Sequence, residues 1–90
     1  MALNPDWDSW SSEEVQKYFG EKVRERRLRF GLTQQQLGDF AGLSKQAIND
    51  IEKGRRSTLV TKAIKIAACL ETNVAYLAGA DDDDAPAIKE

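Results

Sequence analysis

Residues 32–54 read Leu-Thr-Gln-Gln-Gln-Leu-Gly-Asp-Phe-Ala-Gly-Leu-Ser-Lys-Gln-Ala-Ile-Asn-Asp-Ile-Glu-Lys-Gly, and they carry the strongest local signals of secondary structure in the chain. Thr33 can accept a hydrogen bond as the N-cap of one helix, and Gln36, three residues later, can complete a capping box. Ser44 can cap a second helix in the same way. Gly42 stands between the two, where a left-handed backbone conformation costs glycine little. The stretch therefore predicts two short helices joined by a glycine turn.

Both predicted helices are amphipathic. Their inward stripe is expected to hold apolar residues at helical spacing, namely Leu37, Phe40 and Ala41 in the first helix and Ala47, Ile48 and Ile51 in the second. This assignment leaves polar or charged residues on the outer side of the second helix, namely Lys45, Gln46, Asn49 and Asp50. Two helices joined in this manner present one helix end to a groove of duplex DNA, where short polar side chains suit base edges and phosphates. The stretch therefore predicts DNA binding.

The segment resembles the Cro and phage-repressor class of helix-turn-helix proteins, the xenobiotic-response-element group. The resemblance extends from about residue 19 to residue 79, and its strongest pieces keep a fixed order. They are Val23-Arg24-Glu25-Arg26-Arg27, Leu32-Thr33-Gln34, Ala41-Gly42-Leu43-Ser44, Ile51-Glu52-Lys53-Gly54-Arg55, and then Ile66-Ala67 and Leu70. The resemblance implies an all-α, lambda-repressor-like domain. Three residues depart from the pattern. Relatives usually have alanine at Gly38 and often have an apolar residue at Arg26. Asp50 places a carboxylate near the groove, where it could accept from cytosine N4 or repel phosphates and so reduce non-specific binding.

The resemblance also implies roles for individual residues. Base contacts are expected from the second helix and its start, at Ser44, Lys45, Gln46, Asn49 and Asp50; Gln46 and Asn49 could each pair with adenine through two bonds. Phosphate contacts are expected from Gln34 and Gln35 at the start of the first helix and from Lys53, Arg55 and Arg56 after the second. Arg27 and Glu52 match a pair that forms a buried or half-buried ion pair in many relatives. A dimer contact is expected near the last helix, with Tyr76 and Leu77 as candidates.

The remainder of the chain is also predicted to be helical. Ser11 or Ser12 can cap a helix, and Gly20 is expected to break it into a short lead-in helix and a main helix that ends near Gly31. A further helix is expected over residues 59–70, with Leu59, Ala63, Ile66, Ala67 and Leu70 inward, and Asn73 can cap a last short helix. The prediction is a compact domain of five or six helices over residues 15–79. An acidic arm (1–14) precedes it and an acidic disordered tail (80–90) follows.

The distribution of charge agrees with DNA binding better than the net charge of −2 does. Residues 15–70 hold 12 Lys and Arg against 5 Asp and Glu, whereas both ends are acidic. A protein that neutralises phosphates needs local positive charge, and its net charge matters less. A basic domain between acidic ends is therefore compatible with a DNA-binding role.

Composition excludes several classes of function. One cysteine and no histidine exclude an internal disulfide and make a zinc site implausible, and no cofactor or metal is expected. Cys69 is expected to be a small core residue. The chain has no run of about 18 apolar residues and no signal-peptide pattern, so we expect no membrane segment and a cytoplasmic location, in a bacterial or phage-infected cell. It has no phosphate-cradling glycine loop and no nucleophile–base set, so an enzyme is not expected.

Two functions remain open from the sequence. The first is a sequence-specific, double-stranded-DNA-binding transcriptional regulator, a small dimeric (Cro-like) repressor that binds a two-fold symmetric operator in the major groove. The alternative is an antitoxin similar to the HipB and HigA kinds, which would bind a toxin protein and regulate its own operon. In that case the arm with Trp7 and Trp10, or the tail with Asp81–Asp84, would hold the toxin.

Overall fold

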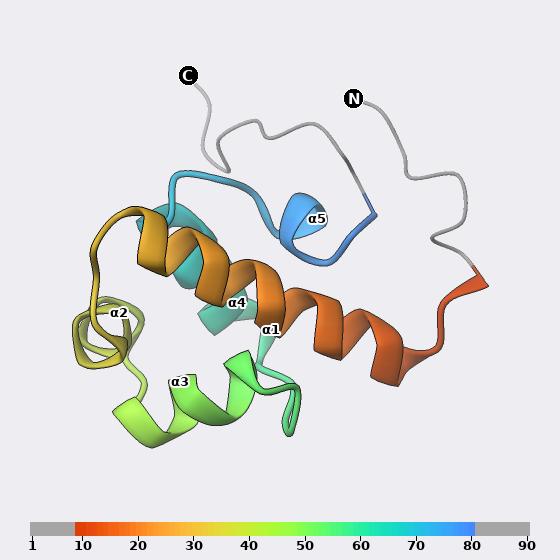
Figure 1. Cartoon of the computed structure of the whole chain (residues 1–90), viewed down its shortest axis with the longest axis horizontal. Coiled ribbons are helices and arrows are strands. Elements are labelled where there is room, and N and C mark those ends of the chain that lie inside the picture. Colours follow the sequence, from red (N-terminus) through yellow and green to blue (C-terminus); the bar gives the residue numbers. More distant parts are fainter. Residues whose placement is uncertain (1–8, 81–90) are drawn as a thin grey trace.

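The computed structural model describes residues 9–80, and every regular element within that range is an α-helix (Figure 1). The five helices are α1 (Ser12–Arg29), α2 (Gln34–Ala41), α3 (Lys45–Glu52), α4 (Val60–Cys69) and α5 (Val74–Leu77). The all-α prediction is confirmed, with five helices. Trp7, most of the predicted arm and the Asp81–Asp84 tract lie outside the described residues. Residues 12–14, which the prediction assigned to the arm, belong to α1, because α1 begins at Ser12.

Four of the five helices begin at a side-chain N-cap. The capping oxygen of Ser11, Thr33, Ser44 or Asn73 accepts a hydrogen bond from a backbone N–H three residues further on. Capping boxes are complete at the starts of α1 and α2, where Glu14 and Gln36 bond back to the N-cap backbone. The polar residues in these loops therefore determine where the helices start.

The prediction that Gly20 breaks the first helix is wrong. α1 is one helix of 18 residues, and Gly20 lies buried in its middle. A Cβ atom at this position would overlap the carbonyl oxygen of Ile51 and lie 2.8 Å from the carbonyl oxygen of Glu52. Gly20 therefore allows the backbones of α1 and α3 to approach closely, and it does not end a helix.

The hydrophobic core lies between all five helices. α1 packs against α3 on one side and α5 on the other, while α2 packs against both α3 and α4 (Figure 1). The largest side chains with almost no exposed surface come from every helix and from the turn after α4: Val23, Leu37, Ile48, Ile51, Ile66, Leu70, Thr72 and Leu77.

Two residues assigned to inward stripes are exposed instead. Phe40 is 57% exposed, because the buried side of α2 is formed by Leu37, Gly38 and Ala41. Leu59 is 72% exposed, because it is the extended N-cap residue of α4 and lies outside the helix. Both predictions were wrong, since spacing alone cannot show which side of a short helix meets its neighbours.

Candidate nucleic-acid interface

The turn between α2 and α3 is tight. Gly42 adopts a left-handed conformation with φ 75° and ψ 35° and ends α2. The backbone N–H of Leu43 donates to the carbonyl oxygen of Gly38 at 2.8 Å. A Cβ atom on Gly38 would overlap the carbonyl oxygen of Leu43, so glycine at this position allows the chain to pass close to α2. Ser44 then caps α3 through the N–H of Ala47 at 3.0 Å. These contacts set α3 firmly against α2.

The outer side of α3 carries the five residues proposed to contact bases. Ser44, Lys45 and Gln46 are exposed, and Asn49 and Asp50 are half-buried, whereas Ala47, Ile48 and Ile51 point into the core. Gln46 Nε2 donates to Asp50 Oδ1 at 3.0 Å, and Arg55 Nη1 lies 3.9 Å from the same oxygen. In the free protein, two of the proposed base-contacting side chains are therefore bonded to each other.

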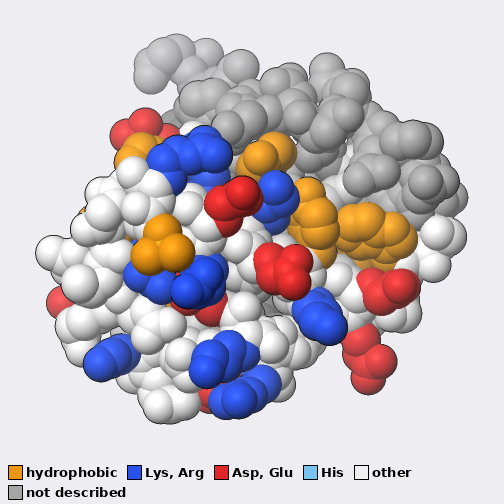
Figure 2. Space-filling model, in the orientation of Figure 1, with side chains coloured by type: hydrophobic (Ala, Val, Ile, Leu, Met, Phe, Trp, Pro, Cys, Tyr) orange, Lys and Arg blue, Asp and Glu red, His pale blue; other side chains and the backbone are white. Residues whose placement is uncertain are grey.

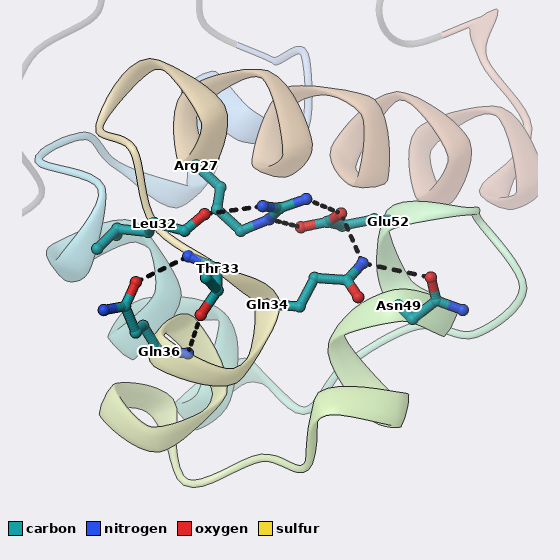
Figure 3. A network of polar contacts seen from close by, with 7 residues as sticks. All are labelled: Arg27, Leu32, Thr33, Gln34, Gln36, Asn49 and Glu52. Atoms are coloured by element: carbon teal, nitrogen blue, oxygen red, sulfur yellow. Dashed lines mark hydrogen bonds and ion pairs between the residues drawn. The ribbon is translucent and has the colours of Figure 1, made fainter.

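A polar network joins α1, α2 and α3 beneath this surface (Figure 3). Arg27 donates from Nε to Glu52 Oε2 at 2.7 Å, from Nη2 to Glu52 Oε1 at 3.0 Å, and from Nη1 to the carbonyl oxygen of Leu32 at 2.8 Å. The side chains of Arg27 and Glu52 are 9% and 1% exposed. Their hydrogen bonds and charge attraction raise the pKa of the Arg27 guanidinium. The ion pair implied by the resemblance is therefore present, and it ties α1 to the last residue of α3.

The same network extends to the outer side of α3. Gln34 Nε2 donates to Glu52 Oε1 at 3.1 Å and to Asn49 Oδ1 at 3.2 Å (Figure 3). The sequence assigned Gln34 only to a phosphate, and this double contact was missed. A signal existed, because Asn49 and Glu52 are three residues apart and share one side of α3.

The fold and these contacts are those of a helix-turn-helix protein, and the helix-turn-helix (HTH_3) family model matches residues 23–77. The chain belongs to this family. It is 42% identical over 45 residues to YgzD, an uncharacterized HTH-type transcriptional regulator of Bacillus subtilis, a match that covers 50% of this chain and 68% of the relative.

Solved helix-turn-helix proteins share the fold. The restriction-modification controller protein C.AhdI from Aeromonas hydrophila is 30% identical, with a TM-score of 0.63, and the match covers 70% of this chain and 94% of the controller protein. The P22 c2 repressor, solved in complex with a synthetic operator, is 27% identical, with a TM-score of 0.64 and coverage of 66% of this chain and 89% of the repressor. The resemblance to phage repressors and the lambda-repressor-like fold are both confirmed.

In this helix-turn-helix domain the residues proposed to contact phosphates lie at two places. Gln34 and Gln35 open α2, and exposed Gln35 donates from Nε2 to Asp39 Oδ1 at 2.9 Å. Lys53, Arg55 and Arg56 are exposed at the end of α3 and in the following loop. Figure 2 shows Lys and Arg side chains over the end of the molecule that α3 forms, at the bottom of the view. The proposed phosphate contacts therefore flank the outer side of α3.

The two candidates for a dimer contact lie in different environments. Leu77 has no exposed surface and belongs to the core, so it cannot contact a second subunit in this conformation, and that prediction was wrong. Tyr76 is half-buried, with Lys22 Nζ 5.8 Å and the Arg26 guanidinium carbon 6.0 Å from its ring centroid. It remains a candidate.

Neither a metal site nor a membrane span is found within residues 9–80. No group of His, Cys, Asp or Glu side chains in this range could hold a metal ion, and no helix there is long and apolar enough to cross a membrane. Cys69 is half-buried against the core, and this burial raises the pKa of its thiol. A raised pKa disfavours the reactive thiolate, which agrees with a packing role for Cys69.

Proposed function

We propose that this helix-turn-helix protein is a sequence-specific, double-stranded-DNA-binding transcriptional regulator and acts as a small dimeric repressor. One observation carries the proposal. The outer side of α3 gathers short polar and cationic side chains on a helix that α1 and α2 hold rigidly through the Arg27–Glu52 network. Rigid placement of hydrogen-bonding groups is what recognition of base edges in the major groove requires. In this role the protein acts by occupying DNA in the cytoplasm and not by catalysis.

A dimer is supported by an apolar surface between the first half of α1 and the start of α4, which Val74 of α5 also lines. A groove of ≈ 600 Å³ is lined mainly by apolar side chains, among them Trp10, Val15, Phe19, Val60, Ala63 and Val74. At its edge Val60 is 70% exposed, next to Leu59, which is 72% exposed. Exposed apolar surface of this kind favours protein contacts. A second copy that uses the same surface in return would form an isologous contact and so a two-fold symmetric DNA-binding unit.

The first test is selection of binding sites from random duplexes with the purified full chain at near-physiological salt. We expect enrichment of a two-fold symmetric site with half-sites about 34 Å apart, or a multiple of that distance. Weak, salt-sensitive binding without an enriched site would contradict the proposal. That outcome would favour the antitoxin alternative, in which the apolar groove would seat a toxin.

The basic residues after α3 are expected to contribute affinity without selectivity. Arg56→Gln should weaken binding about equally for all sequences and lower the slope of log K against log salt by about 1, because one phosphate contact is lost. The measurement is a salt titration of binding to the selected site and to a scrambled duplex. Lys65→Gln is the matched control, since Lys65 is an exposed cation on α4, outside the proposed interface. An unchanged slope for Arg56→Gln would remove this residue from the interface.

A further inference from the structure

The side chain of Gln34 connects a buried carboxylate to a proposed base-contacting residue. Its Nε2 donates to Glu52 Oε1 at 3.1 Å and to Asn49 Oδ1 at 3.2 Å. Asn49 is half-buried, and Glu52 is 5% exposed. Figure 3 shows the Gln34 nitrogen between the two oxygens, with the amide nitrogen of Asn49 directed away from it.

Chemistry fixes the orientation of both amides. An ionised carboxylate only accepts hydrogen bonds, so Gln34 must turn its NH₂ group and not its oxygen toward Glu52. Arg27 holds the Glu52 carboxylate in place through its two hydrogen bonds. Because the same Gln34 nitrogen also faces Asn49, Asn49 must turn its oxygen inward. Because the Glu52 carboxylate can only accept, these contacts determine which end of each amide is the nitrogen and which is the oxygen.

We propose that Gln34 is a positioning residue that makes Asn49 a hydrogen-bond donor to DNA. The Asn49 oxygen accepts from Gln34, so Asn49 directs its NH₂ group outward. Within residues 9–80 this NH₂ group donates no hydrogen bond. The matching groove atoms are acceptors, namely purine N7, guanine O6 and thymine O4. Two-bond pairing with adenine, which the sequence suggested, would use the oxygen that already accepts from Gln34. The inference rests on the proposed function, because it concerns how the same surface discriminates between bases.

The test is a double-mutant cycle on base discrimination with the full-length protein. Asn49→Ala, Gln34→Ala and the double variant are titrated against the selected site and against sites changed at each base pair. Asn49→Ala should lower discrimination at one base pair by about fivefold or more. Gln34→Ala should lower discrimination at the same base pair, and the double variant should lose no more than Asn49→Ala alone.

Asp39→Ala is the matched control, because Asp39 is an exposed residue of the same helix, lies outside the proposed interface, and has its hydrogen bond with Gln35 rather than with the network. It should leave the discrimination ratio unchanged. The proposal is overturned if Gln34→Ala weakens binding to every site equally, which would make Gln34 a phosphate contact alone. Thermal melts of each variant confirm that the comparison is made between folded proteins.

Asn49→Asp tests the same idea without altering Gln34. The carboxylate that this substitution introduces can still accept from Gln34, but it presents an oxygen outward in place of the NH₂ group. Site selection with this variant should lose the preference for an acceptor at that base pair. An unchanged preference would overturn the inference. Failure of the proposed function is a separate outcome, because the wild-type protein would then select no site at all.

Discussion

Arg27→Met is expected to lower the free energy of unfolding by about 3–5 kcal/mol, because it leaves the Glu52 carboxylate buried without its partner. The Glu52 side chain is 1% exposed, and both of its oxygens accept hydrogen bonds from Arg27. Water cannot replace those bonds without opening the contact between α1 and α3. In a domain of this size the melting temperature should fall by roughly 12 °C or more, measured by circular dichroism.

A surface ion pair supplies the control for Arg27. Lys22 and Glu25 form a pair at 3.1 Å, and the Glu25 side chain is 55% exposed. Glu25→Gln should therefore change stability by less than about 1 kcal/mol. The double variant Arg27→Met/Glu52→Leu should be more stable than Arg27→Met alone, since it removes the stranded carboxylate. An Arg27→Met melting curve that coincides with the wild-type curve would show that the pair does not hold the helices together.

The features that sequence predicted well depend on short stretches of chain. Thr33 and Gln36 form their capping box within four residues, and Gly42 ends α2 through its own backbone conformation. Ser44 and Asn73 likewise cap the helices that follow them directly. Such signals are complete in the local sequence, so their outcome does not depend on where the other helices pack.

Contacts between distant segments were harder to predict. Arg26 is 5% exposed and donates from Nη2 to the carbonyl oxygens of Leu70, at 2.8 Å, and Glu71, at 3.2 Å. The Arg26 guanidinium therefore supplies hydrogen bonds to carbonyl groups at the end of α4 that have no partner within the helix. Nothing near Arg26 in the sequence indicates that α4 ends beside it. The sequence marks this residue only as unusual for its position.

The same limit applies to the candidate site. The outer side of α3 was predicted correctly as a surface, because its apolar residues had to face the core. The bond from Gln34 to Asn49 spans 15 residues and depends on how α2 and α3 meet. Leu77 shows the converse, since the resemblance to phage repressors suggested a dimer contact at this residue, whereas packing buries it completely. The sequence therefore identified the residues of the proposed interface better than their bonding.

Gly20→Ala is expected to destabilise the domain by about 3 kcal/mol, although alanine in a helix interior is ordinarily the more stable residue by up to about 1 kcal/mol. The substitution is expected to lower stability here and not to raise it, because the new methyl group would overlap the Ile51 carbonyl oxygen and come within 2.8 Å of the Glu52 carbonyl oxygen. These are backbone atoms at the end of α3, so relief requires moving the whole helix.

Urea unfolding of Gly20→Ala, compared with that of Glu21→Ala, separates the two effects. Glu21 is the next residue of α1 and is exposed, so its substitution reports helix propensity alone and should change stability by less than about 0.5 kcal/mol. A Gly20→Ala protein as stable as the wild type would mean that α1 and α3 do not approach as closely as the buried glycine indicates. If the variant folds but is destabilised, a shifted α3 should also weaken binding to the selected DNA site, because the residues proposed to contact bases lie on that helix.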